Sequence, residues 1–283
     1  MFRSLRALAR LRSTRVAIVA TVAAAAILVL TVPGLAGALR SSVPPPPENP
    51  TSADEIQNVD QVKTAIRAYY GDTPTSTVDP VDNSIDGADV QLHTFSPTSA
   101  YAEELGDIVS HAEQVLAEPR HGHGTKAILF DVDDTTLNTF DYEIYSNFVF
   151  DPTTNNAFAD AAIFPAVPHM VDLEKFAESL GYEVFFLTGR RDPRRPGTIA
   201  NLTGQGYDLE EDHLYTRPLD DAAPWLTSCA PTCTTIQYKS LTRQHIESLG
   251  FDIVANFGDQ FSDLTGGFAD ETFKLPNPMY FLP

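Results

Sequence analysis

Short apolar runs alternate with amphipathic stretches in the second half of the chain. Three apolar runs, KAILFD (126–131), EVFFLT (183–188) and DIVANFG (252–258), each end in polar residues or glycine. Continuous apolar runs of this length are typical of strands that are buried on both faces of a sheet. Helical spacing predicts helices over 171–180 and 239–249. This alternation predicts an α/β fold, with a parallel sheet flanked by helices.

The first half of the chain contains two further helical patterns. Apolar residues recur at helical spacing in 58–70 and in 96–119, and Ser96 or Ser99 is a candidate cap for the second helix. The segment between them, TPTSTVDPVDNSIDGAD at 73–89, is rich in turn-forming residues and predicts a loop.

The N-terminal segment is typical of targeting sequences. Residues 1–38 contain five arginines and no acidic residue, and 16–32 is an uncharged apolar stretch. Ala36 and Ala38 fit the small-x-small pattern of a signal-peptide cleavage site. An uncleaved membrane anchor is the alternative, since seventeen residues lie near the lower limit for a span. Either interpretation predicts a secreted or extracytoplasmic protein, with contact to the membrane only through this segment.

The rest of the chain is acidic. A Pro-rich polar stretch within 39–57 predicts an extended linker, followed by a single domain over 58–283. The whole chain has a formal charge of −19, and without the five N-terminal arginines it has 14 basic and 38 acidic residues, a charge of −24. This charge argues against nucleic acid polymers as partners, because phosphates attract basic surfaces.

Two cysteines, Cys229 and Cys233, form the short motif CAPTC. A short-loop disulfide is plausible in an exported protein. A metal site would need further ligands, which the neighbouring Ser, Thr and Pro residues do not supply, and CxxxC is not the redox spacing CxxC.

Three aspartates, Asp131, Asp133 and Asp134, follow the first apolar run. Like charges at such short separation repel each other, so their proximity needs a reason. A calcium-binding EF-hand loop is excluded, because Thr136 and Tyr142 occupy the positions of its glycine and its last acidic ligand. A solvated turn remains the alternative to a metal or catalytic site.

The ends of the other two runs favour a site. Thr188 and Gly189 could bind a phosphate-like anion, while Asp259 and Asp263 are spaced so that a helical turn brings them to one side. Lys239 starts the helix predicted before the last strand. Since reactive residues of parallel sheets gather at the carboxyl ends of strands, these groups are expected to meet. Carboxylates for a hard cation, a hydroxyl and an ammonium group suit phosphoryl transfer.

The chemistry assigns different tasks to the first two aspartates. Asp131 can attack phosphorus and form an aspartyl-phosphate. Asp133 can protonate the leaving oxygen and then deprotonate the water that hydrolyses the intermediate. A divalent ion is required to screen the dianionic ester from the attacking carboxylate, and Mg²⁺ suits an all-oxygen site.

These motifs resemble a known set. DVDDT (131–135), TGR (188–190), Lys239 and GDQFSD (258–263) resemble, in order, the four motifs of haloacid dehalogenase-like phosphohydrolases. The segments FLTGR, YKSLTR, GDQFSDLTGG and TFKLPNPMYF resemble those of class B acid phosphatases and plant vegetative storage proteins, over about 125–283.

The resemblance implies a Rossmannoid sheet with Asp131 as the nucleophile and Asp133 as the general acid and base. Thr188 would bind the phosphoryl group and Lys239 would brace it. It implies three sets of site residues: catalytic Asp131, Asp133, Thr188 and Lys239; substrate-binding Thr135, Gly189 and Arg190; and Mg²⁺ ligands Asp131, Asp133 (through its carbonyl), Asp259 and Asp263.

In this superfamily, an insertion between the first two motifs forms a cap, which here corresponds to 139–170. It is rich in aromatic residues, which either form a wall that stacks on a substrate ring or pack the cap onto the domain. These residues are Phe140, Tyr142, Tyr145, Phe148 and Phe150.

Three weaker motifs have structural alternatives. His121 and His123 could bind a metal or form a flexible turn; Arg194 and Arg195 could attract anionic substrates or lie in a solvated loop. The sequence NLT at Asn201 fits a glycosylation acceptor, although so short a match is frequent by chance.

The sequence thus predicts an exported, Mg²⁺-dependent acid phosphatase acting on small-molecule phosphomonoesters; the acidic pH optimum is implied by the resemblance alone. Two alternatives remain: a non-catalytic storage or binding protein on the same scaffold, and a phosphotransferase in which an alcohol replaces water as the acceptor.

Overall fold

The computed structural model describes residues 50–56, 58–81, 89–119 and 124–283. The predicted signal or anchor segment, most of the predicted linker and the pair His121 and His123 lie outside the described residues. No helix within the described ranges is long and apolar enough to span a membrane.

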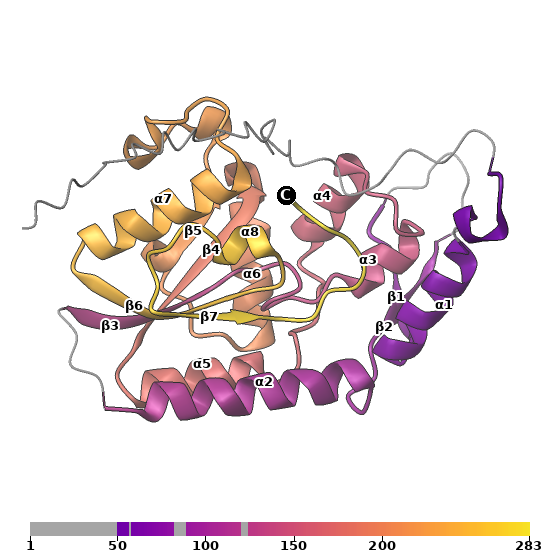
Figure 1. Cartoon of the computed structure of the whole chain (residues 1–283), viewed down its shortest axis with the longest axis horizontal. Helices are drawn as coiled ribbons and strands as arrows, with labels where there is room; N and C mark the ends of the chain where they lie inside the picture. Colours follow the sequence, from indigo (N-terminus) through magenta and orange to yellow (C-terminus); the bar gives the residue numbers. More distant parts are fainter. Residues whose placement is uncertain (1–49, 57, 82–88, 120–123) are drawn as a thin grey trace, which may run out of the picture. The chain divides into compact units, whose positions relative to one another are not determined.

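A five-stranded parallel sheet with the order β5-β4-β3-β6-β7 forms the centre of the domain (Figure 1). The central strand, β3, pairs with β4 on one side and with β6 on the other. The α/β fold with a parallel sheet is therefore confirmed. The strands are β3 (Thr125–Phe130), β4 (Glu183–Arg191), β5 (Leu214–Arg217), β6 (Phe251–Gly258) and β7 (Glu271–Lys274).

Alternate residues of the strands face two separate hydrophobic clusters. In β3, Ile128 and Phe130 belong to one cluster, whereas Ala127 and Leu129 belong to the other. The first cluster includes buried residues of α2, α5 and α6, among other helices. The second includes residues of α7, which lies across the sheet from α2 and α5 (Figure 1). These helices are α2 (Ala100–Ala117), α5 (Met170–Ser179), α6 (Arg195–Gln205) and α7 (Thr235–Ser248).

The helix expected over 239–249 is present but begins earlier. A capping box closes its start: the Thr234 side chain accepts a hydrogen bond from the Gln237 backbone, and the Gln237 side chain accepts one from the Thr234 backbone. Lys239 therefore lies one turn inside α7 rather than at its start.

The N-terminal part of the domain adds α1 (Val59–Tyr70) and a two-stranded antiparallel sheet of β1 (Thr73–Val78) and β2 (Gln91–Thr94). The prediction of a loop over 73–89 was wrong for its first residues, which form β1. Threonine and valine are β-branched and suit a strand even when it is mostly exposed, as β1 is. Ser99 is the cap of α2, since its hydroxyl accepts a hydrogen bond from the Ala102 backbone.

The segment 139–170 contains two helices, α3 (Phe140–Tyr145) and α4 (Pro152–Ala161). A side chain at Gly197 of α6 would collide with the backbone of α4 at Ala159, so the glycine permits their close contact. Most aromatic residues of the segment pack into the core, and Phe150 is the exception, with 68% of its surface exposed. Those that pack are Phe140, Tyr142, Tyr145, Phe148, Phe158 and Phe164.

Two of the smaller sequence motifs are settled by the structure. Cys229 and Cys233 form a disulfide. Asn201 is 1% exposed, and its side chain donates to the Phe164 carbonyl and accepts from the Phe164 amide. The glycosylation interpretation of Asn201 is therefore wrong, because the folded protein leaves no room for a glycan there.

Glu174 of α5 is fully buried, and only one of its carboxylate oxygens has a hydrogen bond within the described structure, from the Asp208 amide at 2.9 Å. Burial raises the pKa of Glu174 to about 8 from an ordinary value of 4.5. In the unfolded chain, the Glu174 carboxyl loses its proton at a lower pH than it does in the folded protein. Its contribution to stability is therefore complete below the unfolded pKa and is lost as the pH rises to about 8.

We expect Glu174→Gln to remove this dependence. Between about pH 5 and 8, the unfolding free energy of the wild type should fall relative to the variant by roughly 1.4 kcal/mol per pH unit. Denaturant unfolding across pH would measure the difference, with Glu103→Gln, at an exposed position of α2, as the matched control. Parallel curves for the wild type and Glu174→Gln would contradict the assignment.

Candidate active site

Acidic side chains from two neighbouring strands meet at the carboxyl edge of the sheet. Asp131 follows β3, and Asp259 follows β6, which pairs with β3. Asp263 lies in α8 (Phe261–Leu264), a short helix that starts just beyond β6. A side chain at Gly258 would collide with that of Asp263, so the glycine lets the helix fold back over the end of the strand.

Lys239 reaches this edge from α7 and links the acidic groups. Its Nζ donates a hydrogen bond to Asp131 Oδ1 and another to the Leu187 carbonyl at 2.6 Å, and lies 3.1 Å from Asp263 Oδ1. Burial alone would lower the pKa of Lys239, but Asp131 and Asp263 outweigh it and the pKa is raised. Lys239 is therefore a fixed positive charge beneath the carboxylates.

The carboxylates of Asp131, Asp259 and Asp263 form a compact group. One oxygen from each lies within 4.8 Å of the others, and all three residues are at most 6% exposed. Burial and the charge of Asp263 raise the pKa of Asp131 to about 8, and the same two causes raise that of Asp259 well above its ordinary range. An oxygen-only set that resists carrying its negative charges fits a hard divalent cation, which would neutralise them.

Neighbouring side chains hold Asp259 in position. Its Oδ2 accepts hydrogen bonds from Gln260 Nε2 at 2.6 Å and from Asn277 Nδ2 at 2.7 Å, and its backbone amide donates to Thr135 Oγ1 at 3.0 Å. Such supporting contacts orient a metal-binding carboxylate. The sequence motifs did not identify Gln260 or Asn277 as site residues. Thr135 was predicted to bind the substrate, but in the structure it is fully buried behind Asp259.

Among the aspartates of the site, Asp133 is the most exposed to solvent, with a third of its side chain accessible. The guanidinium of Arg190 donates to both of its oxygens, at 2.7 Å from Nη2 and 3.1 Å from Nε, and also to Thr198. The Arg190 side chain is only 7% exposed. Arg190 was predicted to contact the substrate; in this structure it makes most of its side-chain hydrogen bonds to Asp133.

Asp134 turns away from the cation group and supports the loop. Its backbone has a φ of 53°, which Asp tolerates better than most residues. Its carboxylate accepts from the Thr139 amide at 2.9 Å, the Thr139 hydroxyl at 2.6 Å and the Tyr280 hydroxyl at 2.6 Å. Burial raises the pKa of Asp134 to about 6, and these hydrogen bonds limit the rise. The third aspartate thus fixes the turn that carries the other two.

Thr188 lies in β4, three residues before the end of the strand, and is fully buried. Its hydroxyl accepts a hydrogen bond from the Arg190 amide at 3.1 Å, and its carbonyl accepts one from the Tyr238 hydroxyl at 3.1 Å. Gly189, the next residue, lines the cavity, and a side chain there would meet nothing within 4 Å.

A cavity of about 400 Å³ opens above these groups. One side is apolar, formed by Phe150 next to α4 and by Leu282 near the end of the described chain. Another side is basic, with Arg194 among its residues; Arg194 pairs with Asp160 of α4, so it belongs to the cavity wall rather than to a free surface loop. Of the predicted site residues, those lining the cavity are Asp131, Asp133, Gly189, Arg190, Lys239, Asp259 and Asp263.

Comparison with known proteins matches this chain to one family. The model of the HAD superfamily, subfamily IIIB (acid phosphatase), matches residues 57–283. Acid phosphatase 1 of Solanum lycopersicum is 36% identical over 163 residues, which cover 56% of this chain and 60% of that protein. Vegetative storage protein 2 of Arabidopsis thaliana is 29% identical over 159 residues, covering 55% of this chain and 56% of that protein.

The match spans about three fifths of the length of the tomato acid phosphatase and of the stem 28 kDa glycoprotein of Glycine max, which is 32% identical over 165 residues, covering 56% of this chain and 61% of that protein. Among solved structures, the class C acid phosphatase of Bacillus anthracis has the same fold, with a TM-score of 0.54 and 20% identity over 65% of this chain and 80% of that one. The family match covers the sheet and all the groups gathered at its carboxyl edge. The chain belongs to the HAD superfamily, subfamily IIIB, the acid phosphatase subfamily.

Proposed function

We propose that this protein is an exported, Mg²⁺-dependent phosphomonoesterase that works through an aspartyl-phosphate on Asp131. The observation that carries the proposal is the convergence of Asp131, Asp259, Asp263 and Lys239 at one cavity. Three buried carboxylates with a single lysine among them have an excess of negative charge. A divalent cation would balance it, and would also screen the negative charge that a substrate phosphate brings.

Mg²⁺ would be held by Asp131, Asp259 and the backbone carbonyl of Asp133, with Asp263 as a ligand or a support. When bound, the ion would screen the charge of the phosphate ester and stabilise the charge that develops on the phosphoryl oxygens. The hydrogen bonds from Gln260 and Asn277 to Asp259 leave that carboxylate in one orientation, as a metal ligand requires.

The protein's own residues would perform two chemical steps. In the first, an oxygen of Asp131 attacks phosphorus, the bond to the leaving oxygen breaks, and Asp133 gives that oxygen a proton. In the second, Asp133 takes a proton from water, the water oxygen attacks phosphorus, and phosphate leaves as the Asp131 carboxylate is restored. Lys239 would hold Asp131 in place and offset charge during both steps.

Asp133 suits the role of proton donor because its side chain is open to the cavity. The ion pair with Arg190 fixes its orientation between turnovers. For Asp133 to protonate the leaving oxygen, the substrate must replace part of that ion pair, which would bring Arg190 within reach of the phosphoryl oxygens. Gly189, beside them, leaves space for the phosphoryl group. Thr188 would contact this group only after a small movement, since it is buried here.

The cavity suits small phosphate esters. Its volume of about 400 Å³ lies in the range of small-molecule sites. Phe150 and Leu282 offer an apolar surface for the leaving group, so an aromatic or nucleoside group would be favoured over a purely polar one. Of the aromatic residues predicted to face the substrate, only Phe150 lines the cavity.

Removal of the metal tests the proposal. We expect chelator-treated protein to lose release of phosphate from an aryl phosphate, and Mg²⁺ to restore it. Mg²⁺ should also raise the thermal unfolding midpoint, because it would neutralise Asp131, Asp259 and Asp263. A matched preparation of Asp259→Asn should show neither effect.

The storage-protein alternative has a distinct outcome in the same experiment. Some relatives are named vegetative storage proteins, and a silent scaffold could keep a metal site. Stabilisation by Mg²⁺ without turnover of aryl, nucleoside or sugar phosphates would refute the phosphatase proposal in favour of this alternative.

A further inference from the structure

A second group of potential metal ligands lies at the opposite, amino-terminal edge of the sheet. Glu183 is the first residue of β4, and His213 immediately precedes β5, its parallel neighbour. Glu210 lies just ahead of the short helix η3 (Glu211–His213). Because Asp131 and Asp259 follow the carboxyl ends of their strands, this group is separate from the candidate active site.

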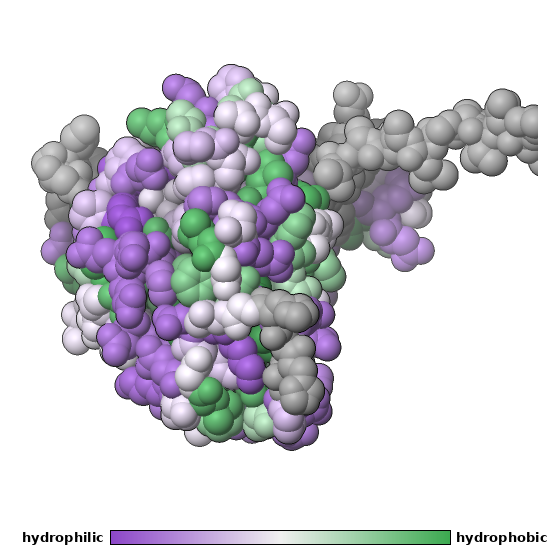
Figure 2. Space-filling model, turned by 90° about the vertical axis from the view of Figure 1, so that its left-hand side faces the viewer, coloured by the Kyte–Doolittle hydropathy of each residue, from purple (hydrophilic) through white to green (hydrophobic). Residues whose placement is uncertain are grey.

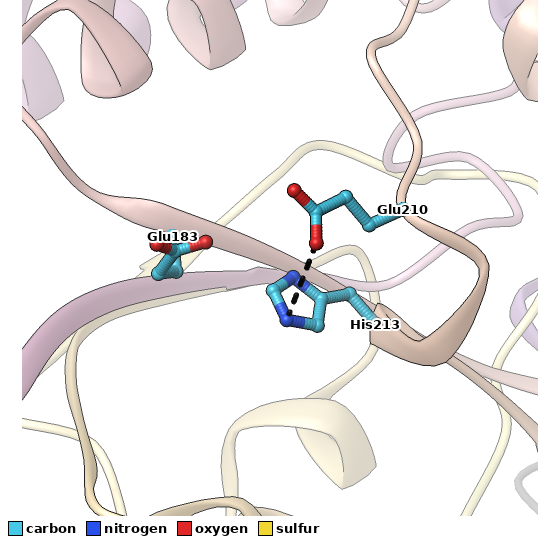
Figure 3. Close-up of side chains that lie close together, drawn as sticks. All are labelled: Glu183, Glu210 and His213. Carbon is cyan, nitrogen blue, oxygen red and sulfur yellow. Dashed lines mark ion pairs between the residues drawn. The ribbon is translucent and has the colours of Figure 1, made fainter.

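The three side chains converge (Figure 3). The carboxyl group of Glu183 lies on one side of the His213 ring, and Glu210 approaches the ring from the preceding loop. One potential ligand atom from each residue lies within 4.8 Å of the others. The ring nitrogen Nε2 of His213 is 3.9 Å from Glu210 Oε2, which is too long for a hydrogen bond.

The His213 ring is held in the orientation of a ligand. The residue is 9% exposed, and its ring stacks on Phe185 with 4.0 Å between ring centroids. Its Nδ1 lies 3.1 Å from the Val184 carbonyl oxygen. A carbonyl can only accept, so Nδ1 carries the proton and Nε2 presents its lone pair to the two glutamates when the ring is neutral. No hydrogen bond to Nε2 occurs in the described part of the chain.

Charges of both signs surround the group: Arg195 donates to the Glu211 carbonyl, and several acidic residues act on Glu178. Glu178 has a raised pKa, caused first by its partial burial and then by the charges of Asp208, Glu183 and Glu210, with Lys175 opposing them. Figure 2 views the molecule from the amino-terminal edge of the sheet, and hydrophilic residues predominate on this face. A cation would thus meet a hydrophilic face of the molecule, with a buried imidazole beneath it.

We propose that Glu183, Glu210 and His213 bind a Zn²⁺ ion, with water completing its coordination. One imidazole nitrogen and two carboxylate oxygens suit zinc better than Mg²⁺ or Ca²⁺, which prefer oxygen ligands alone. Ligand atoms on a tetrahedral zinc ion lie about 3.4 Å apart, so this group must contract by about 1.4 Å or less. Glu210 can make that movement, because its side chain is 68% exposed.

The bound ion would connect the start of β4 to the start of β5. The role is structural: the zinc would tie edge strand β5 and the loop before it to β4, without contact to the phosphoryl site. We therefore expect zinc to stabilise the fold, and we expect the effect to depend on Glu210.

Zinc binding should be measured by calorimetry on the full chain without a polyhistidine tag, in an Asp259→Asn background that breaks the active-site carboxylate group. One Zn²⁺ per chain should bind and raise the thermal unfolding midpoint. Adding Glu210→Gln should weaken binding by at least about tenfold and remove the thermal shift. Glu211→Gln, a neighbouring exposed carboxylate of equal charge, is the matched control and should behave as the background does.

The same experiment can overturn the proposal. Equal binding in the Glu210→Gln and Glu211→Gln proteins would place the zinc elsewhere, for instance at His121 and His123. Absence of zinc binding in the background protein would show that His213 and Glu210 form only an ion pair. Because Glu210 is exposed, its replacement should leave the fold intact, and circular dichroism of each variant would verify this.

Discussion

Asp131→Asn is expected to lower the rate of phosphate release by on the order of 10⁴-fold or more, while the protein remains folded. Asparagine keeps the shape of the side chain but cannot act as the attacking carboxylate. Lys239 keeps two of its partners in this variant, the Leu187 carbonyl and Asp263. Steady-state release of phosphate from an aryl phosphate, together with thermal unfolding, would measure both expectations.

A second variant separates the two chemical steps. In Asp133→Asn, an aryl phosphate with a good leaving group should still phosphorylate Asp131, but water should attack the intermediate slowly. A burst of the phenol product, equal in amount to the protein, is expected from Asp133→Asn and not from Asp131→Asn. An Asp131→Asn protein that retained wild-type turnover would disprove the role of Asp131 as the nucleophile.

Lys239→Met is expected to lower both activity and stability. Its removal leaves Asp131 and Asp263 buried without their shared cation. Breaking such a buried pair typically costs on the order of 3–5 kcal/mol of unfolding free energy at neutral pH. The loss should grow as the pH rises above about 8, because Asp131 then becomes ionised with no cation beside it. Activity should fall by on the order of 10²-fold or more, since a preorganised positive charge is lost.

A double-mutant cycle tests this explanation. If repulsion between the carboxylates causes the destabilisation, Lys239→Met combined with Asp263→Asn should be more stable than Lys239→Met alone. Lys175→Met, at an exposed position of α5, controls for the loss of a lysine. A Lys239→Met protein as stable as the Lys175→Met protein at neutral pH would show that the acidic group does not need this cation.

The centre of the fold could be predicted from the sequence because its strands are buried on both faces. β3, β4 and β6 are long apolar runs, and the carboxyl end of each carries residues of the site. Burial on both faces demands continuous apolar residues, and parallel pairing brings the strand ends together. The positions of Asp131, Asp259 and Lys239 at one cavity therefore followed from the motifs alone.

The edges of the sheet could not be predicted in this way. β5 and β7 have four residues each, and their sequences, LYTR and ETFK, are too short and too polar to show a pattern. β1 was missed for a related reason, since most of its residues are exposed. Helix α6 begins with Arg-Pro-Gly and contains few apolar residues, so its helical spacing is weak.

The supporting residues of the site also escaped prediction, because their roles depend on contacts distant in sequence. Asn277 contacts Asp259 from 18 residues away, and Tyr280 contacts Asp134 from 146 residues away. His213 and Glu183 are brought together only by the pairing of β4 with β5. No local spacing marks such residues.

The strand order also determines when the protein can become active during its synthesis. Of the five strands in the parallel sheet, β3 is made first, and β4 can pair with it as soon as both have been translated. The other edge of β3 stays bare until β6 is made; Thr135 and Asp259, which then hydrogen-bond, are 124 residues apart in the chain. A nascent chain therefore exposes an apolar strand edge, which is prone to aggregation and suited to a chaperone. Docking of β6 covers this edge and delivers Asp259 to Asp131, so the last strand pairing beside β3 both protects the folding chain and completes the site.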